Sequence, residues 1–202
     1  MLRFRPTSIG LLFVLASCAT DTGIGPLVDY EEVNASTIID APSPTPGQSA
    51  PGNLYVAERG EYLVELLGCG ACHTDGALVG EPNFERSLAG SQVGIAWNNP
   101  LGDRYPAVVY PPNITPDIET GIGKWSDQQI ANAIRAGLGR HGERRIAAMP
   151  WQGYATISDS DIVAITAYLR SIEPVAHRVP DEVAPGQRAT APFVYFGVYR
   201  SR

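Results

Sequence analysis

Five consecutive residues, Cys69-Gly-Ala-Cys-His73, constrain the fold more than any other feature of this chain. On a helix, the two thiols lie about one turn apart, so each can bond to one of two vinyl groups on the edge of a porphyrin. The adjacent imidazole then lies beneath the metal at the centre of the ring. This C-x-x-C-H pattern is typical of covalent haem c attachment. We therefore expect one haem bound by Cys69, Cys72 and His73.

Three other roles for the two cysteines fit the sequence less well. A thiol–disulfide motif favours a thioredoxin-like βαβ pattern, which is absent. A zinc site needs further Cys or His at ligand spacing, and no Cys follows Cys72. A structural disulfide between Cys69 and Cys72 stays open as an alternative, although it would not require His73.

An iron that only transfers electrons needs a sixth ligand, and few residues can supply it. Apart from Met1, the chain contains a single methionine, Met149, which precedes Pro150. A lone methionine usually fills a core, but a thioether on haem iron favours the ferrous state. Met149 is the predicted axial ligand and His141 the alternative. We expect His177, beyond the last predicted helix, at the surface.

Residues 1–17 are predicted to be a lipoprotein signal peptide. Arg3 and Arg5 precede an apolar run that is shorter than the roughly 20 residues of a membrane-spanning helix. The following Leu-Ala-Ser-Cys18 resembles the bacterial lipobox, in which the cysteine is lipidated. The alternative is a plain signal peptide with an incidental Cys18. We expect export and lipid anchoring to an envelope membrane, facing the periplasm or extracytoplasmic space.

Residues 18–52 are predicted to be a lipidated tether. The segment contains five acidic residues, no basic residue and several prolines, so it has little to bury. The alternative is that part of it packs on the domain. The formal net charge of −6 argues against nucleic-acid binding, which favours a basic face.

Residues 53–173 are predicted to form a small all-α domain. Apolar periodicity predicts helices over 53–67, 127–138 and 159–172, the first with a stripe through Val56, Gly60, Leu63 and Leu67. Ser126 and Ser158 are the expected N-caps of the second and third helices. The long connector 74–112 shows no strong strand alternation. Its expected packing residues are Phe84, Trp97, Tyr105, Val108, Val109 and Tyr110.

Two further features lie outside this scaffold. Four arginines, opposed there only by Glu143, occur within 11 residues: Arg135, Arg140, Arg144 and Arg145. They are expected to steer an acidic partner toward the haem edge. The alternatives are a solvated face and pairing with the haem propionates. The C-terminal extension 174–202 contains an aromatic stretch, Phe193–Phe196. We expect it to fold back over the domain or to dock on a partner subunit.

These motifs resemble the class I cytochrome c family, and more narrowly the haem domains of membrane-associated dehydrogenase cytochrome c subunits, such as those serving alcohol, aldehyde and gluconate oxidation. The resemblance covers residues 55–175 and is carried by the haem motif and by Asn113-Ile-Thr-Pro-Asp117, Thr120-Gly-Ile-Gly123 with Trp125, Ala148-Met149-Pro150, and Asp161 through Arg170.

The resemblance implies a small class I cytochrome c fold around one covalently bound haem, with long loops and extended terminal segments. It implies that the first and last helices cross near Gly60 and Tyr168, and that Asn113 and Trp125 lie at the haem. The alternative for 113–123 is a turn region beside a buried tryptophan. Such dehydrogenase subunits typically carry three haem motifs, and this chain carries one. The resemblance therefore implies only the electron-relay chemistry of the family for this chain, and not the substrate pathway.

The expected function is therefore one-electron transfer by a membrane-tethered monohaem c-type cytochrome, without enzymatic activity of its own. Its partners would be envelope redox proteins or subunits of a respiratory complex. Two other functions stay open. One is a peroxidase-like haem enzyme using His141, Arg144 and Arg145. The other is a structural or docking subunit of a respiratory complex.

Overall fold

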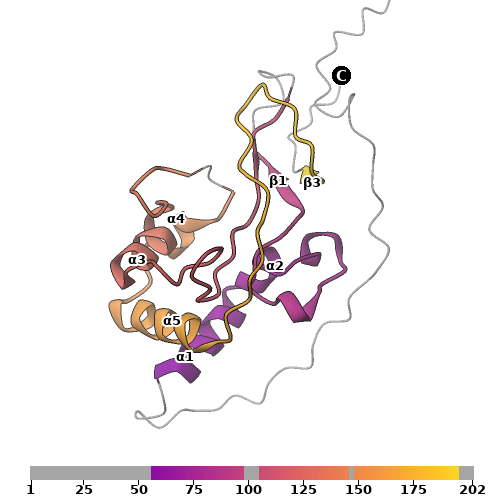
Figure 1. Cartoon of the computed structure of the whole chain (residues 1–202). Helices are drawn as coiled ribbons and strands as arrows, with labels where there is room; N and C mark the ends of the chain where they lie inside the picture. The colour runs from indigo at the N-terminus through magenta and orange to yellow at the C-terminus, as the bar shows by residue number, and fades with distance from the viewer. Residues whose placement is uncertain (1–55, 98–104, 146–147, 196–202) are drawn as a thin grey trace, which may run out of the picture.

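The computed structural model describes residues 56–97, 105–145 and 148–195, shown in colour in Figure 1. The predicted signal peptide, Cys18 and the tether lie outside the described residues. Within the described ranges, each helix is too short or too polar to cross a bilayer.

The three predicted helices are present and begin close to the expected positions. They are α1 (Val56–Leu66), α3 (Asp127–Ala136) and α5 (Asp159–Ser171), and they end one or two residues earlier than predicted. Two short helices, α2 (Cys69–His73) and α4 (Trp151–Tyr154), and the 3₁₀ turns η1 (Ala77–Val79) and η2 (Phe84–Arg86) were not predicted. Segments of three to five residues are too short to show a helical period.

The predicted N-caps explain why α3 and α5 begin where they do. The Ser126 hydroxyl accepts a hydrogen bond from the Gln129 backbone N–H at 3.2 Å, and the Gln129 side-chain oxygen accepts one from the Ser126 N–H at 2.7 Å. The Ser158 hydroxyl accepts the Asp161 N–H in the same way. Each bond satisfies an N–H that the first helical turn leaves without a partner.

Helices α1 and α5 cross at Gly60, as the resemblance implied. A Cβ atom there would lie 2.7 Å from the Cβ of Tyr168 and closer still to the carbonyl of Ala164. The expected stripe on α1 is partly wrong, because Val56 is 54% exposed whereas Val64 is 3% exposed. Val64 packs in one hydrophobic cluster with Ile165 and Leu169 of α5, whereas Val56 lies at the exposed start of α1.

A small sheet, which corrects the all-α expectation, lies at the other end of the domain. Its strand order is β2-β1-β3, from β1 (Gly94–Ala96), β2 (Val108–Val109) and β3 (Phe193–Tyr195). Strand β1 is antiparallel to β2 and parallel to β3. The sequence did not reveal these strands because each is two or three residues long, and β1 and β2 are buried throughout rather than alternating.

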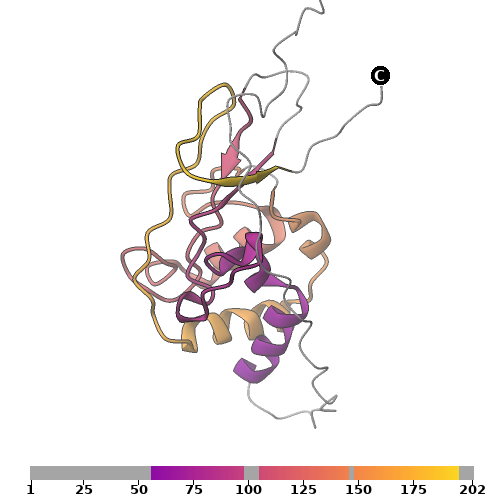
Figure 2. The same cartoon turned by 90° about the vertical axis from the view of Figure 1, so that its right-hand side faces the viewer.

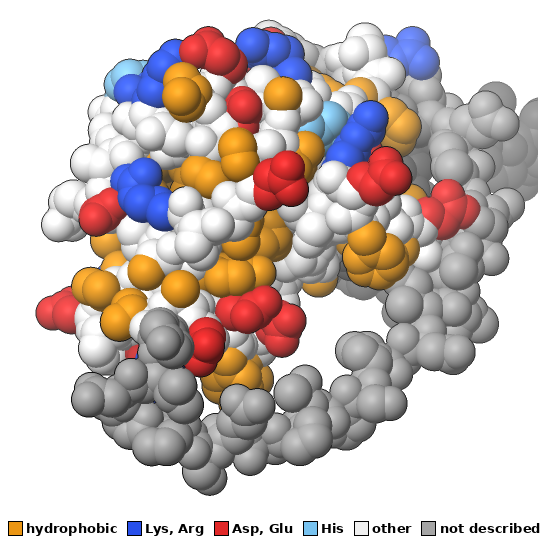
Figure 3. Space-filling view, turned by 60° about the horizontal axis from the view of Figure 1, so that its bottom comes forward, with side chains coloured by type: hydrophobic (Ala, Val, Ile, Leu, Met, Phe, Trp, Pro, Cys, Tyr) orange, Lys and Arg blue, Asp and Glu red, His pale blue; other side chains and the backbone are white. Residues whose placement is uncertain are grey.

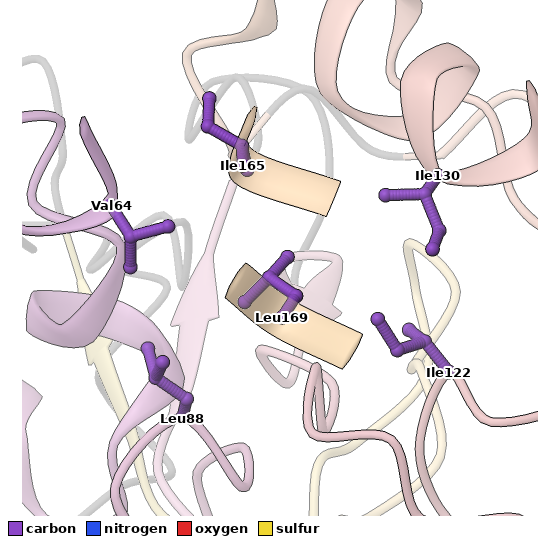
Figure 4. Packing of buried hydrophobic residues seen from close by; sticks show 6 residues of the cluster. All are labelled: Val64, Leu88, Ile122, Ile130, Ile165 and Leu169. Atoms are coloured by element: carbon purple, nitrogen blue, oxygen red, sulfur yellow. The ribbon is translucent and has the colours of Figure 1, made fainter. Parts of the chain in front are cut away.

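The described residues contain two hydrophobic cores. The side chains of the first gather around α5, as Figure 4 shows: Val64, Leu88, Ile122, Ile130, Ile165 and Leu169. The second lies at the sheet and includes Val108 and Tyr110, as predicted. Phe84 and Trp97 were predicted to pack, but they are 79% and 47% exposed.

After α5, residues 173–192 run along the domain to the sheet, as Figures 1 and 2 show; we call this segment the strap. The Asn113 amide donates to the Val175 carbonyl at 2.7 Å. The Val108 N–H donates to the Val183 carbonyl at 3.0 Å, and the Tyr110 hydroxyl to that of Ala191 at 3.0 Å. Through residue 195, the C-terminal extension therefore packs on the domain.

His177, expected at the surface, is 8% exposed because the strap carries it inward. Its Nδ1 lies 2.9 Å from the carbonyl of Ala89, and its Nε2 lies 3.0 Å from the amide nitrogen of Gln92. Its position beyond the last helix suggested exposure. The position is buried because the strap folds back rather than leaving the domain.

Candidate haem site

An apolar cavity opens between α2, α3, α4 and the 109–125 loop. The space not filled by protein atoms is about 1340 Å³, a figure that includes solvent at the open mouth of the cavity. Its apolar lining comes from segments that are far apart in the sequence and includes Leu67, Ile95, Val109, Ile114, Ile134, Leu138 and Leu169. On the face drawn in Figure 3, hydrophobic side chains gather at the centre, with acidic and basic side chains around them.

Cys69, Cys72, His73 and Met149 all line this cavity, although they come from distant parts of the sequence. Gly68 adopts a left-handed conformation (φ 68°), which lets α1 end and α2 begin immediately. Both cysteines are free thiols in the structure, so no disulfide joins them. Burial raises the pKa of Cys69 to about 11, so this thiol stays protonated near neutral pH.

The imidazole of His73 is oriented for metal binding by one hydrogen bond. Its Nδ1 lies 2.7 Å from the carbonyl oxygen of Pro112. A carbonyl only accepts hydrogen bonds, so Nδ1 carries the proton and the lone pair is on Nε2. Burial lowers the pKa of His73, and the positive charge of Arg145 lowers it further. The neutral tautomer is the one that ligates metals.

Met149 lies in the loop that leads into α4. The Trp151 N–H donates to the Met149 carbonyl at 2.8 Å, and the Trp151 ring packs on Gly137 at the end of α3. His141, the alternative ligand, is exposed and does not line the cavity. Of the two predicted sixth ligands, Met149 is therefore the one that shares the cavity with His73.

Asn113 and Trp125 also line the cavity, but the polar atoms of Asn113 are used within the protein. Its side-chain oxygen accepts the N–H and the hydroxyl of Thr115 at 2.9 and 2.7 Å. Its amide donates to Thr120 and to the strap. Asn113 thus shapes the 113–123 loop, and its role as a haem-binding residue stays a prediction.

The arginine cluster does not form one continuous patch. Arg135 lies 2.8 Å from Asp159, which removes one charge from the expected local excess. Arg140 donates to the Lys124 carbonyl, and Arg144 lies over the Trp151 ring, 5.9 Å from its centroid. Arg145 alone of the four lines the apolar cavity, a position that sequence spacing did not reveal.

The residues present fit haem c. Two thiols one helical turn apart, a neutral imidazole and a thioether all face a cavity whose other walls are apolar. Zinc does not fit as well, because no group of three or more His, Cys, Asp or Glu side chains converges among the described residues. The fold and the site together define the class of proteins that bind haem through a C-x-x-C-H motif.

Comparison with known proteins gives the family. The sequence model of the Cytochrome c family matches residues 57–173, which is more than half of the 202-residue chain. The chain belongs to the cytochrome c family.

Similar proteins include several dehydrogenase subunits. The chain is 36% identical over 134 residues to the gluconate 2-dehydrogenase cytochrome c subunit of Pantoea cypripedii, covering 66% of this chain and 27% of that protein. It is 38% identical over 127 residues to the alcohol dehydrogenase (quinone) cytochrome c subunit of Gluconobacter oxydans, covering 61% and 23%. It is 31% identical over 153 residues to the fructose dehydrogenase cytochrome subunit of Gluconobacter japonicus, covering 75% and 27%. The match spans about a quarter of the length of each of these relatives.

Proposed function

We propose that this chain is a monohaem c-type cytochrome that transfers single electrons and is tethered to the envelope membrane through a lipid on Cys18. The observation that carries the proposal is that Cys69, Cys72, His73 and Met149 line one apolar cavity. The similar proteins named as dehydrogenase cytochrome subunits support a dehydrogenase, or another subunit of its complex, as the redox partner.

When bound, haem c supplies an iron centre that alternates between the ferric and ferrous states. Each cysteine thiol would add across one vinyl group, with sulfur bonding to one carbon and hydrogen ending on the other. The Nε2 of His73 and the sulfur of Met149 would be the axial ligands. A methionine ligand raises the reduction potential compared with a second histidine.

The residues around the proposed haem site restrict the reactions available to a bound iron. The Pro112 carbonyl holds the His73 ring in one tautomer and one orientation. Apolar walls would limit the access of water to a bound haem, and a Met149 thioether on the iron would keep small molecules from binding there. This arrangement supports electron transfer rather than peroxidase chemistry, since the exposed His141 lies outside the cavity.

The test is to express the full chain in a bacterial host that exports proteins and attaches haem c. Intact-mass measurement should show one covalent haem, and the reduced protein should give the absorption spectrum of a low-spin c-type cytochrome. The double variant Cys69→Ala/Cys72→Ala should carry no covalent haem. An unmodified polypeptide from the unsubstituted chain would contradict the proposal.

Membrane tethering is tested separately with Cys18→Ser. The unsubstituted protein should fractionate with membranes and incorporate labelled fatty acid, whereas Cys18→Ser should do neither. Cys18 lies far along the sequence from Cys69 and Cys72, so covalent haem serves as the internal control. Equal membrane recovery of both proteins would argue against the lipid anchor.

A further inference from the structure

His177, the buried histidine of the strap, has a hydrogen-bond partner for each ring nitrogen. Its Nδ1 lies 2.9 Å from the Ala89 carbonyl oxygen, and a carbonyl only accepts hydrogen bonds, so Nδ1 carries the proton. Its Nε2 lies 3.0 Å from the side-chain nitrogen of Gln92. That nitrogen also donates to the Arg178 carbonyl at 2.7 Å, which fixes the orientation of the Gln92 amide. The Nε2 atom of His177 is therefore an acceptor.

The residue that follows Ala89 contacts the predicted haem ligand. The Gly90 N–H donates to the His73 carbonyl at 2.7 Å. Gly90 adopts a left-handed conformation (φ 86°), and a Cβ atom there would lie 2.6 Å from Cγ1 of the strap residue Val179. The same Cβ atom would lie 2.7 Å from a backbone nitrogen of the 109–125 loop. Gly90 thus fits closely between the strap, this loop and the backbone of His73.

The 89–91 segment also connects to the carbonyl that orients the ring of His73. That carbonyl belongs to Pro112 and lies 2.7 Å from Nδ1 of His73. The Ser91 N–H donates to the carbonyl of Pro111, the residue before Pro112, at 3.0 Å. A displacement of the 89–91 segment would therefore disturb both the backbone of His73 and the acceptor of its ring proton.

The 89–91 segment is held at its centre by the strap and on both sides by the haem motif. The Asp75 carboxylate accepts the Gln92 N–H at 2.9 Å and a guanidinium N–H of Arg86 at 2.8 Å. Arg86 Nη1 and Asp75 Oδ2 also lie 3.4 and 3.8 Å from Nε2 of His177. Among the side chains that the structure describes, only His177 donates to a carbonyl of the 89–91 segment.

We propose that His177 is a positioning residue for the haem site, which holds the 89–91 segment in place and thereby fixes the orientation of the His73 imidazole on the iron. This inference rests on the proposed function. Its physical basis is that residues behind a metal ligand set the orientation of its ring and so tune the metal. The orientation of an axial imidazole determines its overlap with the iron d orbitals, on which the g values of the ferric electron paramagnetic resonance (EPR) spectrum depend.

The test compares the haem-bound variants His177→Leu, His177→Asn and Ala176→Ser. Leucine fills space but cannot donate, so His177→Leu should keep its covalent haem and shift the ferric g values. Exchange of the Gly90 N–H should be roughly tenfold faster, the effect of losing about one hydrogen bond. Asparagine can place an N–H near the position of Nδ1, so His177→Asn should restore both measurements. Ala176→Ser is the control, because Ala176 is the exposed neighbour of His177 on the strap, and it should change neither.

Thermal unfolding is measured on every variant, since a merely structural role would lower stability without shifting the g values. A ferric spectrum of His177→Leu that superimposes on that of the unsubstituted protein would overturn the assignment. A spectrum of His177→Asn that matches that of His177→Leu would also overturn it, because the hydrogen bond would then have no effect.

If the His177 variants fail to accumulate with haem, the unsubstituted protein decides. In its reduced form, the nitrogen NMR shifts of the His177 ring should show the proton on Nδ1, and an Nδ1 without a proton would overturn the assignment. Absence of covalent haem from the unsubstituted protein would instead refute the proposed function, so the two failures are distinguishable.

Discussion

At the scale of single residues, the proposed haem site depends on hydrogen bonds that orient the two predicted iron ligands. The Pro112 carbonyl fixes the proton of His73 on Nδ1, and the Trp151 N–H holds the backbone of Met149. The first bond is to the backbone of the 109–125 loop and the second joins two backbone groups at the start of α4, so neither involves a charged side chain. The His73 imidazole is neutral because burial lowers its pKa, and a thioether carries no charge, so neither predicted ligand would add charge to the proposed haem site.

Replacing Met149 by leucine should open the second axial position without removing the haem. Leucine keeps the apolar volume but has no sulfur to donate, so the ferric protein should lose its methionine-to-iron charge-transfer band near the red end of the spectrum. The reduced protein should then bind carbon monoxide. Covalent haem, checked by mass, should be retained because Cys69 and Cys72 are intact.

His141→Ala is the matched control, because His141 is exposed and does not line the cavity. It should leave the spectrum unchanged and carbon monoxide unbound. Absence of the band from the unsubstituted protein, together with carbon monoxide binding that appears in His141→Ala but not in Met149→Leu, would mean that histidine is the ligand.

At the scale of elements, the contact between α1 and α5 is both tight and charged. The backbones approach at Gly60, and Arg59 on the same helix pairs with Asp161 in the first turn of α5, with the Arg59 Nε 2.7 Å from the carboxylate. These two contacts should contribute to stability differently. The contact at Gly60 depends on the volume of the side chain at that position. The Arg59–Asp161 pair depends on pH, because Asp161 must be ionised.

Gly60→Ala should destabilise the protein by about 1–3 kcal/mol, because the added methyl group meets the Ala164 carbonyl and the Tyr168 Cβ. Denaturant unfolding of the haem-bound protein measures this. Gly153→Ala is the control, since a Cβ there meets nothing within 4 Å. Equal denaturation midpoints for Gly60→Ala and Gly153→Ala would show that α1 and α5 can move apart with little loss of stability.

Arg59→Gln should reduce stability at neutral pH by roughly 0.2–1 kcal/mol, the range for an exposed ion pair. The hydrogen bond from Arg59 holds the pKa of Asp161 below its usual range. An acid with a lowered folded pKa stabilises the fold above its unfolded pKa of about 3.9, and this contribution is lost as pH falls through the lowered value. The difference between Arg59→Gln and the unsubstituted protein should therefore vanish in acid and persist from about pH 5 upward. A difference that is constant with pH would contradict the ion pair.

At the scale of the whole molecule, the strap joins parts of the fold that are distant in sequence. It binds the haem-side loop through Asn113, and it continues into β3, whose Val194 pairs with Ile95 of β1. The wall of the cavity that contains Pro112 is thus held from the outside by the C-terminal segment. The integrity of the site should depend on residues that never touch the iron.

Asn113→Ala should test this dependence. It leaves the Val175 carbonyl without the Asn113 amide and removes the acceptor of the Thr115 N–H and hydroxyl, which should cost about 1–3 kcal/mol. Hydrogen exchange should accelerate in the strap. Gln128→Ala is the control, because Gln128 is exposed on α3 and its side chain donates to Asn132 on the same helix. Unchanged exchange in the strap of Asn113→Ala would contradict the linkage.

The sequence predicted those parts of the fold that depend on local spacing. The Cys69–His73 motif, the caps at Ser126 and Ser158 and the close approach at Gly60 all follow from a few neighbouring residues or from a family pattern. Contacts between distant segments could not be predicted. The sheet, the burial of His177 and the place of Arg145 all depend on where the strap and the 137–145 segment fold back.

The position of the strap has a consequence for the order in which the protein is completed. A chain grows from its N-terminus, so the segment with Cys69 and Cys72 leaves the ribosome about a hundred residues before Val175, Val183 and Ala191. Until those residues arrive, the segment around Pro112 lacks the hydrogen bonds that Val108, Tyr110 and Asn113 make to the strap. A chain interrupted shortly after α5 would keep both cysteine thiols but would lack the strap contact to Asn113, the residue after the Pro112 carbonyl that bonds to His73.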